Sequence, residues 1–177
     1  LPPPLMRLLF LALLLLSITS KSGAATPNII LFVTDDQSPI AGCYGHADIK
    51  TPHLDSLAAE GTRFTHAFAT TASCSASRSV ILSGLHNHRN GQYGHTHDFH
   101  KFASFPAVAA VSLPLQMKQA GYRTAQIGKY HVAPVSVFEF EKRLAGNARN
   151  ARSMAESCRD LFPVSYTHLR AHETESN

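Results

Sequence analysis

The segment 28–33, Asn-Ile-Ile-Leu-Phe-Val, constrains the fold of this 177-residue chain more than any other feature. Its apolar residues follow one another without polar alternation, which is typical of a strand covered on both faces of a parallel sheet. The run stops at Thr34, Asp35 and Asp36. A strand of this kind favours the α/β class, in which helices lie on the faces of the sheet.

Helix signals alternate with further strand signals downstream. One helix is predicted from Thr51 as N-cap, Pro52 in the first turn and Gly61 as the stop. Its apolar face includes Leu57. Further helices are predicted at 77–82 and 112–120, a short extended or buried segment at 63–69, and another strand at 122–127. This alternation indicates a doubly wound sheet with functional loops at the strand ends.

Two longer stretches complete the predicted organisation. Residues 85–105 are polar and rich in Gly and His, and they follow neither the helix nor the strand period, so we predict a long functional loop. Residues 141–162 are rich in Arg and carry apolar side chains at helical spacing, which predicts a helix.

The two ends of the chain differ from its middle. Residues 1–25 hold Met6-Arg7, an apolar run from Leu8 to Leu16 and then small residues, so we expect upstream residues followed by a signal peptide. A buried N-terminal helix is the alternative. Residues 163–177 show no folding pattern, and we interpret them as an unrelated, artefactual tail. We therefore expect residues 26–162 to form the folded domain.

Composition excludes several classes of protein. With 44% hydrophobic and 16% charged residues, the chain is neither collagen-like nor wholly disordered. The formal charge of +4 comes without a Lys/Arg run, which argues against a nucleic-acid partner. The three cysteines Cys43, Cys74 and Cys158 leave at least one thiol unpaired in an oxidising compartment.

Asp35 and Asp36 are candidate metal ligands. Adjacent carboxylates repel each other, and a hard cation such as Ca²⁺ or Mg²⁺ relieves that repulsion through oxygen ligands. They follow a predicted strand, at the edge where open α/β sheets bind ligands. The alternative is that one of the two aspartates only caps a turn.

Cys74 stands just ahead of a predicted helix, with Arg78 four residues on. A helix N-terminus and a guanidinium stabilise an anion, so the pattern indicates a reactive thiol or an anion site.

The segment Cys74-x-Ala76-x-Arg78, followed by residues 79–84, resembles the motif of the sulfatase family. Position 76 departs from the usual Pro. The resemblance extends from Asn28 to about Phe162 through matching pieces at 35–36, 51–55, 88–91 and 128–131. Residues 91–102 and 128–134 are most similar to the heparan N-sulfatases, or sulfamidases, within that family.

The resemblance implies an alkaline-phosphatase-like α/β fold with a large mixed sheet flanked by helices, of which only the N-terminal portion is present here. It implies that Cys74 is oxidised to formylglycine, whose hydrate attacks sulfur and then expels sulfate. Asp35, Asp36 and modified Cys74 would hold Ca²⁺. Arg78 would anchor the diol, Lys129 would bind a sulfate oxygen, and His131 would handle the diol proton.

The function expected from this resemblance is hydrolysis of a sulfuric ester or sulfamate, with N-sulfated glucosamine of heparan-type chains as substrate. The later Asp-Asn pair of sulfatases has no counterpart before residue 162, so we expect this span to be inactive alone. Expected partners are a sulfated carbohydrate and a formylglycine-generating enzyme, without nucleic acid or a stable membrane anchor; a homodimer is left open. The expected location is the secretory pathway, ending in the lysosome or outside the cell.

Alternatives to this function remain at this stage. An aryl- or other carbohydrate O-sulfatase would share the motif, and a phosphoryl-transfer relative would need Ser or Thr in place of Cys74. The histidines of the 86–100 segment leave room for a secreted, non-catalytic, His-rich metal-binding module. Their spacing fits no compact zinc site, so we interpret them as polar lining of a substrate mouth.

Overall fold

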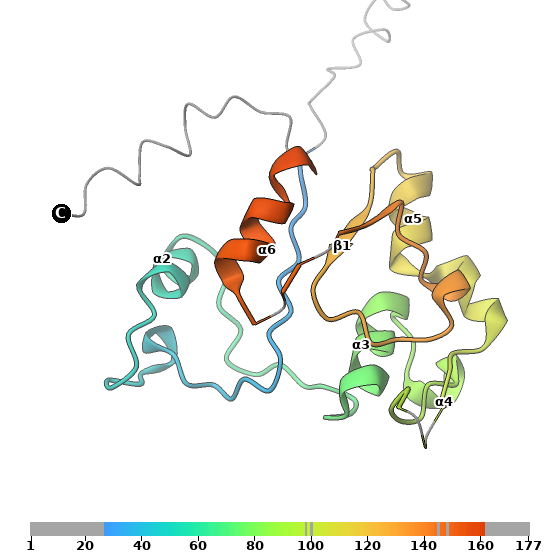
Figure 1. Ribbon diagram of the computed structural model, residues 1–177. Coiled ribbons are helices and arrows are strands. Elements are labelled where there is room, and N and C mark those ends of the chain that lie inside the picture. The colour runs from blue at the N-terminus through green and yellow to red at the C-terminus, as the bar shows by residue number, and fades with distance from the viewer. Residues whose placement is uncertain (1–26, 98, 100, 145, 148, 162–177) are drawn as a thin grey trace, which may run out of the picture. The chain divides into compact units, whose positions relative to one another are not determined.

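The computed structural model describes residues 27–97, 99, 101–144, 146–147 and 149–161 (Figure 1). The predicted signal segment 1–25 and the predicted tail 163–177 lie outside the described residues. The chain divides into two compact units, residues 1–38 and 39–177. Within the described ranges, no helix has the length and apolar character needed to cross a membrane.

The described part of the first unit, residues 27–38, has neither helix nor strand. Its apolar side chains are exposed, with Phe32 at 84%. The prediction of a strand buried on both faces at 28–33 is therefore wrong for this structure. A strand needs a neighbour that supplies hydrogen-bond partners, and no described segment pairs with this one.

The second unit begins with the short 3₁₀ helix η1 (Gly42–Tyr44) and the helix α2 (Pro52–Glu60). The predicted start and stop of α2 are confirmed, with Thr51 as N-cap and Gly61 as C-cap. The Thr51 hydroxyl accepts a hydrogen bond from the Gly42 amide at 2.9 Å, which ties η1 to the start of α2. The predicted apolar face is not buried, since α2 has no buried residue.

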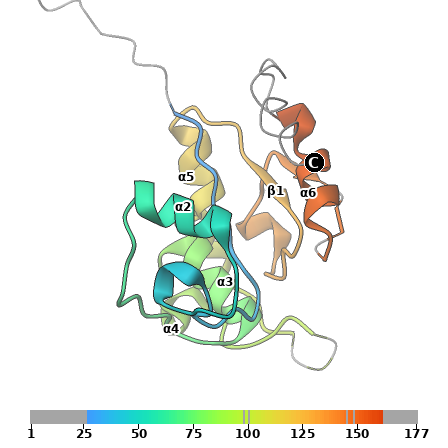
Figure 2. The same cartoon turned by 90° about the vertical axis from the view of Figure 1, so that its left-hand side faces the viewer.

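A group of helices follows: α3 (Cys74–Ser83), α4 (Asn87–Asn90), the 3₁₀ helix η2 (Pro106–Val111) and α5 (Leu113–Gln119). Figures 1 and 2 show α3 between α4 and α5, and α3 contacts both.

The prediction of α5 is confirmed. The helix predicted at 77–82 begins three residues earlier, so Cys74 is its first residue. Residues 63–69, predicted as extended or buried, form no strand and are exposed.

The strands β1 (Ala125–Ile127) and β2 (Lys142–Leu144) form a two-stranded parallel sheet, in which Gln126 pairs with Arg143. Parallel pairing requires a crossover, and this crossover carries Lys129, His131 and the 3₁₀ helix η3 (Val135–Val137). The fold is α/β, but the described residues contain neither a large mixed sheet nor a doubly wound one.

The helix predicted at 141–162 is wrong for its first part, where β2 pairs with β1. Its second part holds α6 (Ala151–Ser157) and the 3₁₀ helix η4 (Arg159–Leu161). Asn150 caps α6, because its side chain accepts a hydrogen bond from the Ser153 amide at 3.0 Å.

A small apolar core lies where the crossover packs against η2. Its buried members come from η2, from the loop 128–134 between β1 and η3 (the site loop), and from η3 with its C-cap: Val108, Tyr130, Val132, Val137 and Phe138. Leu82 at the end of α3 packs against this core. The core therefore holds α3 and the crossover loop in one unit, and these two segments carry the candidate site.

Candidate active site

Cys74 is the first residue of α3, and its side chain is partly buried. Ser73 precedes it as N-cap in an extended conformation, and the Ser73 carbonyl accepts a hydrogen bond from the Ser77 amide at 2.7 Å. The first amides of a helix have no partner inside it, so the sulfur lies at an end that favours negative charge. Cys43, Cys74 and Cys158 are all free thiols in this structure.

Lys129 contacts this sulfur, and Arg78 holds the backbone of Lys129. The Lys129 ammonium lies 3.4 Å from Cys74 Sγ. The Arg78 guanidinium, one turn into α3, donates a hydrogen bond to the Lys129 carbonyl at 2.9 Å. Arg78 therefore fixes the backbone from which Lys129 reaches the sulfur, and it adds a second positive charge.

Tyr130 anchors the loop between Lys129 and His131. Its side chain is buried, its hydroxyl donates to the Phe138 carbonyl at 2.8 Å, and the Arg143 guanidinium lies 4.1 Å from its ring centroid. Tyr130 points into the core, and its neighbours Lys129 and His131 both lie close to Cys74.

His131 has a left-handed backbone, with φ of 50°. Its Nδ1 is buried and has no hydrogen-bond partner among the described residues. Burial lowers the pKa of its imidazole, and the positive charge of Lys129 lowers it further, followed by His97, His95 and Arg78. The lowered pKa favours the neutral imidazole of His131, which can accept a proton.

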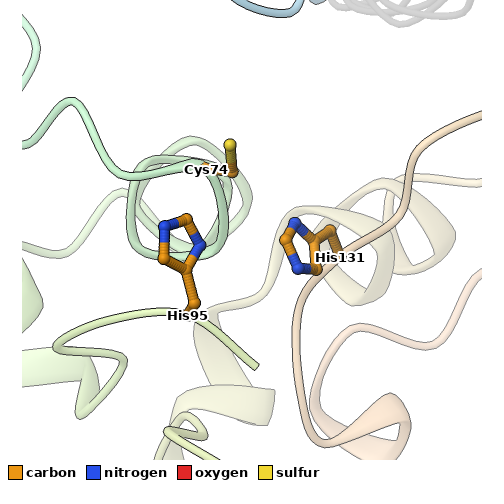
Figure 3. Close-up of side chains that lie close together, drawn as sticks. All are labelled: Cys74, His95 and His131. Carbon is orange, nitrogen blue, oxygen red and sulfur yellow. The ribbon is translucent and has the colours of Figure 1, made fainter. Parts of the chain in front are cut away.

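His95 and His97 complete a cluster of imidazoles. The ring centroid of His131 lies 5.8 Å from that of His95 and 4.8 Å from that of His97. His95 Nε2 lies 3.2 Å from the Ser73 hydroxyl, so this residue reaches the N-terminus of α3. Figure 3 shows Cys74, His95 and His131 close together on three separate segments.

Buried amides hold the segment that carries His95. The Asn90 side chain donates to the Leu85 carbonyl at 3.1 Å and to the Ser79 hydroxyl at 3.0 Å, and it accepts from the Gln92 amide at 2.8 Å. Asn87 donates to the Ala76 carbonyl of α3 at 2.9 Å. The described part of the predicted loop 85–105 is therefore fixed to α3, and it contains a short helix of its own, α4.

Asp35 and Asp36 belong to the first unit, where both are exposed. Asp36 has a left-handed backbone with φ of 54°. Two adjacent carboxylates give the oxygen donors that Ca²⁺ prefers, so their chemistry fits the cation that the sequence analysis assigns to them.

The structure brings four predicted residues together, namely Cys74, Arg78, Lys129 and His131. The sequence predicts His95 only as lining of a substrate mouth, and it does not single out Ser73. No periodicity marks either residue, since their approach depends on how the 85–105 segment packs. Asn87 and Asn90, which lie on α4 and bond to α3, carry no sequence signal that would have predicted this packing.

A partly buried thiol at a helix N-terminus, next to an ammonium, a guanidinium and a neutral imidazole, defines a site for an anionic group on an α/β scaffold. Comparison with known proteins gives the family. The family model described as Sulfatase matches residues 27–168, and the chain belongs to the sulfatase family.

Curated relatives agree with this assignment. The chain is 44% identical to N-sulphoglucosamine sulphohydrolase of Homo sapiens over 72% of its own length and 25% of the relative's. It is 35% identical to an ulvan-active sulfatase of Formosa agariphila over 71% of the chain and 24% of the relative. It is 40% identical to an N-acetylglucosamine-6-O-sulfatase of Bacteroides thetaiotaomicron over 63% of the chain and 19% of the relative. The chain thus spans no more than a quarter of these relatives.

Proposed function

We propose that the whole protein hydrolyses sulfamate or sulfate esters of heparan-type glycans, with N-sulfated glucosamine as the preferred substrate. The observation that carries this proposal is the contact of Lys129 with Cys74 at the start of α3, held by Arg78. The similarity to N-sulphoglucosamine sulphohydrolase supports the choice of substrate. The reaction requires the groups that sulfatases carry beyond this span, so residues 1–177 alone are inactive under this proposal.

Conversion of Cys74 to formylglycine is part of the proposal. When present, the hydrated aldehyde would supply one hydroxyl as nucleophile and a second whose deprotonation would release sulfate, and Ca²⁺ would supply positive charge to the sulfate oxygens. Asp35 and Asp36 would supply carboxylate ligands to Ca²⁺, together with an oxygen of residue 74.

The chain's own residues then have distinct tasks. Lys129 binds a sulfate oxygen through its ammonium, which lies beside the reacting side chain of residue 74. Arg78 positions Lys129 through its carbonyl and adds positive charge. His131 accepts the proton of a diol hydroxyl, and its lowered pKa favours the neutral imidazole that this step needs.

Mass spectrometry tests the conversion. After co-expression of the whole gene product with a formylglycine-generating enzyme, the Cys74 peptide should lose about 18 Da, the difference between thiol and aldehyde. An unchanged thiol, in a host that converts another sulfatase, would contradict the assignment of Cys74.

Sulfate release tests the substrate. The converted whole protein should release sulfate from a non-reducing N-sulfoglucosamine faster than from 6-O-sulfated N-acetylglucosamine or an aryl sulfate. A carbohydrate O-sulfatase is the second candidate, because the N-acetylglucosamine-6-O-sulfatase relative is 40% identical over its matched span. Faster release from the 6-O-sulfate would favour that candidate and leave the family assignment intact.

The location and partners follow as proposals from the same reaction. We propose that the protein enters the secretory pathway, meets a formylglycine-generating enzyme there, and acts in the lysosome or outside the cell. Immunofluorescence of the whole protein, with and without residues 1–25, would show whether that segment directs secretion.

A further inference from the structure

Three potential metal ligands converge at the start of α3. Cys74 Sγ, one ring nitrogen of His95 and one of His131 all lie within 4.8 Å of one another (Figure 3). All three residues are partly buried. Thiolate and imidazole are ligands that Zn²⁺ prefers, and they are poor ligands for the hard cation Ca²⁺.

The imidazoles carry nitrogens that lack a partner. Nδ1 of His95 and Nδ1 of His131 are buried, and neither has a hydrogen-bond partner among the described residues. A buried nitrogen without a partner is costly to the fold, and a metal ion would satisfy it. When His95 Nε2 carries the proton and donates to the Ser73 hydroxyl, Nδ1 keeps its lone pair for a metal.

We infer that Cys74, His95 and His131 bind Zn²⁺ as long as residue 74 remains a cysteine, with water as the fourth ligand. Zn–S and Zn–N bonds of about 2.3 and 2.1 Å bring tetrahedral ligand atoms to about 3.5 Å from one another. The observed separations require each side chain to move by roughly 1 Å or less, which rotamer adjustment allows. The thiol proton leaves as the Zn–S bond forms.

Lys129 opposes this site. Its ammonium lies 3.4 Å from Cys74 Sγ, where it repels a cation and covers one side of the sulfur. Removal of this charge should therefore strengthen zinc binding, whereas removal of a ligand should weaken it. Binding to scattered surface histidines would respond to neither change in this way.

The site and the proposed sulfatase chemistry use different states of residue 74. Conversion to formylglycine removes the sulfur ligand, so a converted protein should lose the site. Zinc binding to the unconverted thiol does not depend on the proposed function, and its failure would leave that function untouched.

Titration with Zn²⁺ tests the site in the purified chain, expressed without a formylglycine-generating enzyme and shown by mass to carry cysteine at position 74. Cys74→Ser and His95→Ala should each weaken binding by about 10-fold or more, since each removes a ligand. Lys129→Met should tighten binding. Cys43→Ser is the matched control for the thiol, and circular dichroism checks that each variant folds.

His97→Ala is the matched control for the imidazoles. His97 lies against both rings, with centroids 4.7 Å from His95 and 4.8 Å from His131, but it is not one of the three converging ligands. Its loss should leave the affinity unchanged. Affinity that falls with His97→Ala and survives Cys74→Ser would mean an all-histidine site and would overturn the inference.

Alkylation of the unaltered chain gives a test that needs no variant. Cys43, Cys74 and Cys158 are all partly buried free thiols, so the other two serve as internal controls. Zn²⁺ should slow the reaction of Cys74 with iodoacetamide and leave the other two rates unchanged, as measured by peptide mass spectrometry. Equal protection of all three thiols, or none of Cys74, would refute the site.

Discussion

Replacement of Asn90 by alanine should destabilise the unit that carries the candidate site. The side chain is fully buried, and it bonds the Leu85 carbonyl, the Ser79 hydroxyl and the Gln92 amide. Each lost hydrogen bond costs about 1 kcal/mol, and the carbonyl and amide left unpaired add about 1 kcal/mol or more, so we expect a loss of roughly 3–4 kcal/mol. This is a large part of the ~5–15 kcal/mol that holds a typical domain folded.

Urea unfolding measures this loss, with Asn90→Ala compared to the exposed neighbour Arg89→Ala as control. The backbone partners fix the orientation of the Asn90 amide, because a carbonyl can only accept and an N–H can only donate. Asn90→Asp should therefore be at least as harmful as the alanine variant, since it places an oxygen against the Leu85 carbonyl. An aspartate variant as stable as the parent would refute this reasoning.

Three further predictions concern the site loop and the sheet. In the converted whole protein, Lys129→Ala should lower the rate of sulfate release by about 100-fold or more, as the loss of one transition-state contact does, and single-turnover assays would measure it. The pKa of His131 is lower in the folded chain than in the unfolded chain, where it is about 6.5. Below that pH the unfolded chain binds a proton at His131 more readily than the folded chain does, so the free energy of unfolding should fall as the pH drops. Urea midpoints at pH 5 and pH 7.5 should differ less in His131→Gln than in the parent. Arg123→Ala breaks an exposed ion pair with Glu141 and should leave the urea midpoint unchanged, whereas a clear shift would show that the pair supports the sheet.

Local signals predicted part of the fold. The Thr51-Pro52 start and the Gly61 stop of α2 are chemical signals that act within one turn, and the structure bears them out. The strand expected at 28–33 depends instead on neighbours that the sequence of the segment does not specify. Composition alone could not tell that residues 142–144 pair with β1, because pairing is a long-range contact.

The same division holds at the site. Cys74 and Arg78 share one helix, and Lys129 and His131 share one loop, so the spacing along the chain already predicted that the members of each pair are neighbours. The contact between the two pairs, made by the Arg78 bond to the Lys129 carbonyl and by Lys129 with Cys74, could not be predicted from spacing, because the segments lie far apart in the sequence. His95 joins them only because buried amides fold its segment against α3.

His131 has a backbone conformation that does not favour folding. A left-handed φ of 50° costs a non-glycine residue about 1 kcal/mol or more, and glycine would relieve that cost. His131→Gly should thus ease the backbone at this point while it removes the imidazole beside Cys74. A directed-evolution screen for heat resistance alone would tend to erase this histidine, so engineering of the protein should hold position 131 constant.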